Sequence, residues 1–165
     1  MQTKKGQKGF SLIELLIVVA IIGIIAAIAI PNLLASRRAA NEGSAQSSLR
    51  TIHSSEATYQ ATTGNGAFTP SATALADLRT ASLIDPVLGS GTKSGYTFTV
   101  PEVTAPATGV LAQFGAQASP QVTSGASQSG TRVFGITEDG VMRGESSLAA
   151  KTTRAQIVAM SALGN

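Results

Sequence analysis

Residues 8–31 of the chain read KGFSLIELLIVVAIIGIIAAIAIP, and the rest of the sequence is organised around this stretch. A hydrophobic run extends from Phe10 to Ile30 and contains one carboxylate, Glu14, near its start. An ionised side chain inside an apolar segment costs roughly 2.5–3.5 kcal/mol on membrane-insertion scales. A segment that only crossed a bilayer would be more stable without this charge, so Glu14 requires a partner.

The run is long enough to approach a membrane span. It contains sixteen uninterrupted apolar or glycine residues, Leu15–Ile30, and with the flanking residues from Phe10 it nears the roughly 20 residues that a span needs. Basic residues before the run favour an orientation with the amino terminus inside. An ordinary secretory signal, cleaved after Ala27–Ala29, and a plain single-span anchor are the alternatives, and neither accounts for Glu14.

Residues 8–14, KGFSLIE, resemble the processing site of type IV prepilins and of their relatives, the pseudopilins of type II secretion. The clear resemblance covers roughly residues 4–62. It implies cleavage after Gly9 by a membrane-embedded prepilin peptidase and N-methylation of the new amino terminus at Phe10. It also implies that Glu14 pairs with the Phe10 amine of a neighbouring subunit.

The resemblance predicts a structural subunit of a type IV pilus-like filament, assembled as a helical homo-oligomer through the apolar helix. It implies an inner-membrane platform protein and a cytoplasmic assembly ATPase as further partners. Before assembly the chain would be a single-pass protein of a bacterial inner membrane with its C-terminal domain in the periplasm, and afterwards part of a cell-surface pilus. One alternative is a type II secretion pseudopilin in a short periplasmic fibre; another is a soluble secreted or membrane-anchored binding domain.

Gly23 and Pro31 punctuate the helix expected from the apolar run. Proline removes a backbone hydrogen bond, and glycine costs about 1 kcal/mol relative to alanine inside a helix. The two residues match positions between which helices of this family unwind as subunits pack into a filament. A kink with a packing glycine explains them equally well, and in an isolated subunit we expect one continuous, gently bent helix.

The predicted fold class is α+β, with a long N-terminal helix packed on a small antiparallel sheet of three or four strands. Apolar residues at helical spacing continue beyond the run and form a stripe that should face the sheet: Leu34, Ala45, Leu49, Ile52 and Tyr59. Glu56 falls beside this stripe, whose edge should therefore be partly wet. We expect a cleaved leader, a membrane or filament-core half of the helix, an amphipathic half and a globular head, at residues 1–9, 10–30, 31–62 and 63–165.

Within the head, Gly64-Asn65-Gly66 should end the long helix. Short helices are predicted over Thr73–Thr80 and Ala155–Leu163, and a turn followed by an exposed connection over Leu83–Gly95. Alternation and β-forming residues predict strands at four places: Tyr96–Val100, Val110–Ala116, Arg132–Thr137 and Val141–Arg143. Loops are predicted at Pro101–Pro106 and over the Ser/Gln/Gly tract Ala118–Gly130, with a tight turn at Glu138–Gly140.

The composition gives no basis for catalysis or for a cofactor. The 165 residues include no cysteine and one histidine, His53, which is predicted to lie on the surface. Glu138, Asp139 and Glu145 could supply oxygens to calcium, but no ligand loop is recognisable, so no metal or other cofactor is predicted.

The overall charge does not indicate a nucleic-acid-binding surface. Of the twelve basic residues, Lys4, Lys5 and Lys8 lie in the leader, so nine basic and nine acidic residues remain after cleavage. A formally neutral mature chain with few aromatic residues predicts no specific nucleic-acid partner.

Overall fold

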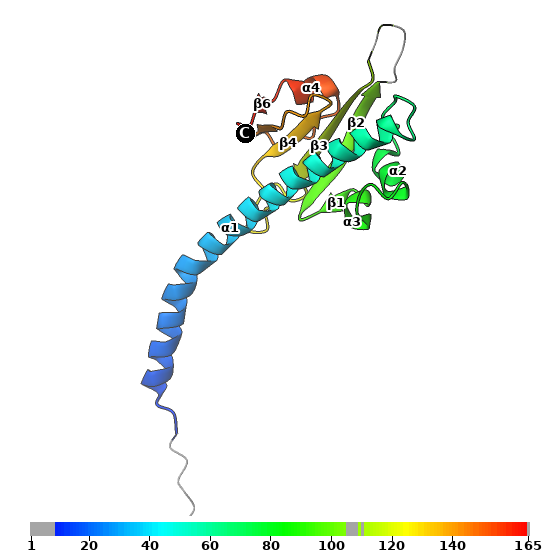
Figure 1. Ribbon diagram of the computed structural model, residues 1–165. Coiled ribbons are helices and arrows are strands. Elements are labelled where there is room, and N and C mark those ends of the chain that lie inside the picture. Colours follow the sequence, from blue (N-terminus) through cyan, green and yellow to red (C-terminus); the bar gives the residue numbers. More distant parts are fainter. Residues whose placement is uncertain (1–8, 105–108, 110, 165) are drawn as a thin grey trace, which may run out of the picture. The chain divides into compact units, whose positions relative to one another are not determined.

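The computed structural model describes residues 9–104, 109 and 111–164 of the chain. The chain divides into two compact units, one ending at Ser36 and the other beginning at Arg37. Helix α1, Leu12–Ala61, runs without interruption and contains Pro31 (Figure 1). It begins two residues later than the predicted start at Phe10.

The first unit is a helix that its own chain leaves uncovered. The large apolar side chains between Phe10 and Leu33 are between 45% and 81% exposed. By length and composition this part of α1 could cross a membrane, with a mean hydropathy of 3.1 over its most apolar window. An uncovered apolar surface of this extent requires either lipid or other protein around it.

In the second unit, α1 packs against the sheet through the predicted stripe from Ala45 onward, whereas Leu34, which was also assigned to that stripe, lies in the first unit and outside this core. Ala45, Leu49 and Ile52 are fully buried, and they share one core with the inward side chains of the sheet, including Phe98, Phe114 and Phe134. The prediction for Glu56 is wrong, because this residue is also fully buried. The helix ends as predicted, with Asn65 and Gly66 at positive φ.

Within the described residues the sheet is antiparallel and has six strands in sequential order, not the three or four predicted. The additional strands are β1 and β6, each two residues long and one at either edge. The strands are β1, Thr92–Lys93; β2, Tyr96–Thr104; β3, Gln113–Pro120; β4, Val133–Thr137; β5, Arg143–Glu145; and β6, Ser161–Ala162.

The boundaries of three strands correct the sequence predictions, and one of them is β5, which covers Arg143–Glu145 in place of the predicted Val141–Arg143. Strand β2 continues through Pro101, which was predicted to begin a loop, and its pairing with β3 shifts register between Thr99 and Glu102. Such a bulge accommodates a proline, which cannot donate to the ladder. Strand β3 ends at Pro120 and so includes the start of the tract predicted as a loop, while Val110 lies outside the described residues.

The part of the second unit that the structure describes also contains three short helices: α2, Ala74–Thr80; α3, Pro86–Gly89; and α4, Arg154–Val158. Helix α2 confirms the prediction for this segment. The segment Leu83–Gly95 is more ordered than predicted, because Asp85 caps α3 by accepting bonds from Val87 N and Leu88 N, both 3.0 Å long. The C-terminal segment forms α4 and then β6 in place of one helix over Ala155–Leu163.

Helix α4 covers the face of the sheet opposite α1 (Figure 1). Ile157 is fully buried there, against two strand glycines. A Cβ atom built on Gly135 would lie 2.6 Å from Ile157 Cγ2, and one on Gly115 would lie 3.0 Å from Ile157 Cδ1. Glycines in β3 and β4 therefore form the surface on which the C-terminal segment packs.

Candidate functional site

The residues predicted for processing and assembly lie at the start of the chain. Gly9 and Phe10 precede α1 and are exposed, Phe10 by 76%. Glu14 lies in the first turn of α1, where the partial positive charge of the helix terminus favours a carboxylate. Among the described residues Glu14 has neither a hydrogen bond nor an ion pair, so no group in this part of its own chain neutralises it.

Gly23 and Pro31 both lie inside the continuous helix α1. A Cβ atom at Gly23 would have no neighbour within 4 Å, so no contact within the described chain requires glycine there. Beside the proline, Asn32 Nδ2 donates to the Ile28 carbonyl at 3.1 Å. The unwinding predicted for this stretch on filament assembly stays a prediction.

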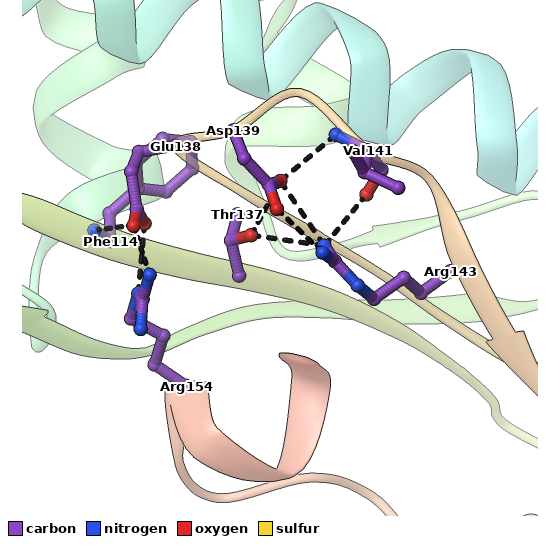
Figure 2. Close-up of polar contacts among 7 residues, drawn as sticks. All are labelled: Phe114, Thr137, Glu138, Asp139, Val141, Arg143 and Arg154. Carbon is purple, nitrogen blue, oxygen red and sulfur yellow. Dashed lines mark hydrogen bonds and ion pairs between the residues drawn. The ribbon is translucent and has the colours of Figure 1, made fainter. Parts of the chain in front are cut away.

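In the second unit, the turn after β4 carries two carboxylates that each meet an arginine (Figure 2). Asp139 accepts bonds from Arg143 Nη1 at 3.1 Å and Nη2 at 2.5 Å. These bonds are the main reason why the pKa of Asp139 lies well below its ordinary value. Partial burial raises this pKa but does not outweigh them. Thr137 Oγ1 donates to the same carboxylate at 2.7 Å, which fixes its orientation.

Glu138 links the turn to the C-terminal segment. It accepts bonds from Arg154 Nη2 and, at 2.9 Å, Arg154 Nε, and its Oε2 accepts from Phe114 N at 3.3 Å (Figure 2). Burial raises the pKa of Glu138, but the bonds and charge of Arg154 outweigh it and leave this pKa below its ordinary value. Lys151 adds a second link, to Glu145 at 2.7 Å.

These pairings bear on the calcium oxygens considered from the sequence. Glu138, Asp139 and Glu145 each face a cationic side chain. In the part of the chain that the structure describes, no group of three or more His, Cys, Asp or Glu residues gathers that could hold a metal ion. The chemistry of the cluster is that of a structural ion-pair network.

Glu56 forms a buried contact with the loop that follows α1. Its carboxylate accepts bonds from Thr69 N, at 3.0 Å, and from Thr69 Oγ1. Burial raises the pKa of Glu56, the two Thr69 bonds lower it, and the charge of Asp77 adds to the rise, so that the pKa lies above its ordinary value. Burial therefore favours the protonated carboxyl group, while the two Thr69 bonds, which tie the end of α1 to the following loop, favour the ionised one.

The Ser/Gln/Gly tract was predicted as a surface loop, and its residues from Gln121 to Ser127 are exposed. Its far end is nevertheless attached to α1. Asn41 Nδ2 donates to the Ser129 carbonyl at 2.9 Å. Glu42 Oε1 accepts from both Thr131 N and Thr131 Oγ1 at 2.7 Å.

His53 differs from its predicted surface position. It is partly buried, and its ring centroid lies 5.9 Å from that of Phe114.

No pattern in the sequence predicted the partners of Glu42, Glu56 or Glu138. One pattern that was available is Thr153-x-x-Gln156, a capping box that fixes the start of α4 and hence the position of Arg154.

The comparisons with known proteins concern the N-terminal segment. Residues 4–30 match the prokaryotic N-terminal methylation motif. The chain is 66% identical over 38 residues to a type IV wide pilus major component of Thermus thermophilus, a match that spans 23% of this chain and 29% of that protein. It is 44% identical over 52 residues to a type IV major pilin of Myxococcus xanthus, across 32% of this chain and 24% of the relative.

A fimbrial protein of Pseudomonas aeruginosa is 82% identical over 28 residues, which span 17% of this chain and 18% of that protein. The chain thus aligns with less than a third of the length of each of these relatives. No solved structure matches the chain. Together with the long helix and antiparallel sheet, the matches confirm the resemblance to the type IV pilin family, which rests on the N-terminal segment.

We predict that Glu56→Gln removes one pH-dependent part of stability. A carboxyl group whose pKa is raised on folding stabilises the fold below its unfolded pKa, and this stabilisation is lost as the pH rises through the folded pKa. The amide is always neutral and keeps an acceptor for Thr69 N. The difference in stability between the wild type and the variant should therefore shrink as the pH rises above about 4. It is measured as the difference between their thermal unfolding temperatures, followed by circular dichroism on the purified chains in detergent. A constant difference between wild type and Glu56→Gln at every pH would contradict the prediction.

We predict that Arg154→Gln lowers the free energy of unfolding by about 1–3 kcal/mol at neutral pH, because it leaves a half-buried carboxylate at Glu138 without its two charged donors. Since the pKa of Glu138 is depressed by folding, the stabilisation is present above its unfolded pKa and is lost as the pH falls through the folded pKa. The deficit of the variant should thus narrow below about pH 4. Urea unfolding of the wild type and the variant at each pH measures the difference in their free energies of unfolding. Lys93→Gln, which breaks an exposed pair, should cost under about 1 kcal/mol, and an equal cost for both variants would refute the assignment.

Proposed function

We propose that the chain is a structural subunit of a type IV pilus-like filament and that it acts by assembly, not by catalysis. The observation that carries this proposal is the combination of a methylation motif at residues 4–30 with an apolar helix that the chain leaves exposed. The matched relatives are pilus components by name. The uncovered helix supports a role in which other copies cover it.

In the proposed pathway, a prepilin peptidase cleaves after Gly9 and the amine of Phe10 is methylated. An α-amino group has a reference pKa of about 7.7–8.0 and so carries a positive charge at neutral pH. In the filament, the Phe10 amine of one subunit pairs with Glu14 of its neighbour. Such a pair in an apolar environment is costly to break from one side, so it sets the register between subunits.

Before assembly, the helix holds the subunit in the bacterial inner membrane with the C-terminal unit in the periplasm. A platform protein and an assembly ATPase then drive the transfer of the helix from lipid into a bundle of like helices. This transfer is feasible because one apolar environment replaces another and Glu14 gains a counter-ion. The alternative is a pseudopilin fibre of type II secretion, whose processing site resembles the same N-terminal residues.

The test of processing is the mass of the N-terminal peptide of the chain recovered from sheared cell-surface material. We expect a peptide that begins at methylated Phe10. The same peptide confined to the membrane fraction would favour a pseudopilin. A terminus at Ile30 would show an ordinary signal peptide and overturn the proposal.

We predict that Glu14→Val and Glu14→Gln leave a membrane-bound, processed subunit that forms few or no filaments. Both variants remove the charge that pairs with the Phe10 amine, and Gln retains the shape of the side chain. Filament yield in sheared fractions, normalised to membrane-bound subunit, is the measurement. Ser11→Ala serves as a control in the same segment, and wild-type filament yield from both Glu14 variants would exclude the pairing role.

A further inference from the structure

Most cations of the second unit have a carboxylate partner within the chain. Among the described residues, five ion pairs account for them: Lys93–Asp85, Arg132–Glu42, Arg143–Asp139, Lys151–Glu145 and Arg154–Glu138. Among the described residues Arg37 and Arg38 form no ion pair, and neither do Arg50 and Arg79. Arg37 and Arg38 differ from the other two in position, because they are the first charges after the apolar segment.

The surroundings of the two arginines leave donors available. Arg37 is exposed. Arg38 is half-buried: its Nε atom is buried without a hydrogen-bond partner among the described atoms, and its Nη2 makes one long contact, to the Gly125 carbonyl at 3.5 Å, so the Nη groups are the donors that it can offer. A guanidinium group has five N–H donors in a planar fork that matches the oxygens of a phosphate group, so these side chains can accept such a ligand without breaking an ion pair.

The length of the helix indicates where a phosphate ligand of Arg37 and Arg38 would lie. At 1.5 Å per residue, a helical stretch as long as Phe10–Ser36 spans about 40 Å. A bilayer is about 40–45 Å thick when its headgroup layers are included. If the start of the apolar run lies at one headgroup layer, Arg37 and Arg38 come at the level of the other.

We propose that Arg37 and Arg38 bind the phosphate groups of anionic lipids in the leaflet opposite the leader. This inference rests on the proposed function, because it requires the helix to span the membrane before assembly. The bound lipids set the depth of the helix in the bilayer, since displacement of the helix in either direction would separate the guanidinium groups from the headgroups. Extraction into a filament must break these contacts, so they act as a releasable anchor.

The experiment uses the full chain, with its leader, in detergent micelles that contain either phosphatidylglycerol or zwitterionic phosphatidylcholine. Native mass spectrometry counts the lipid molecules retained on the protein. All variants are also made with Lys4, Lys5 and Lys8 changed to Gln, which removes binding to the leader. The test variant is Arg37→Gln with Arg38→Gln, and the matched control is Arg50→Gln with Arg79→Gln, which loses the same charge from two other arginines without an ion pair among the described residues.

We expect preferential retention of phosphatidylglycerol by the chain with the neutral leader. The test variant should lose this preference by about fivefold per arginine removed, and the control should keep it. Added inorganic phosphate should not displace the lipid. An equal loss in both double variants would show general attraction by net charge and overturn the inference, as would the absence of any preference. These outcomes are distinct from failure of the proposed function, which would appear as a wrong N-terminus or as a chain that does not enter the bilayer.

Discussion

The constraint on which this molecule depends is an apolar surface that the chain cannot cover by itself. The side chains from Phe10 to Leu33 are exposed, and burial of apolar area is worth roughly 25 cal/mol per Å². Neither the sheet nor any other described element covers them, so this free energy is gained only in lipid or against other protein. The second unit folds without this burial, because its own core lies between the sheet and the part of α1 from Ala45 onward. One helix can therefore serve two environments while the head stays folded.

The head is closed without a disulfide. The chain contains no cysteine, so its last residues are held by packing and by charge. Ile157 fills the surface left by the strand glycines, while Arg154 and Lys151 pair with Glu138 and Glu145. A covalent closure acts at any pH, whereas an ion-pair closure depends on ionised carboxylates. The cohesion of this C-terminal segment thus varies with acidity.

The parts of the fold that the sequence predicted are those with a local repeating pattern. The long helix and its buried stripe follow from 3.6-residue periodicity, and β4 follows from a compact run of β-forming residues. The edge strands β1 and β6 are two residues long, which is too short to show the alternation of apolar and polar residues that predicts a strand. The contacts of Glu56 and Glu138 could not be predicted for another reason. Their partners, Thr69 and Arg154, are brought to them by tertiary folding, and no sequence pattern links either pair.

Glu14 and Glu56 show how the same side chain acquires different roles from its surroundings. Glu56 is fully buried and obtains two donors from Thr69 within the chain, so its requirement is met on folding. Glu14 lies on the uncovered apolar helix and has no partner among the described residues. The chain satisfies a carboxylate wherever its own fold can supply donors, as it does at Glu42, Glu138 and Asp139 as well. Among the described residues Glu14 is the exception, and its place on the uncovered apolar helix supports the proposed pairing with the Phe10 amine of a neighbouring subunit.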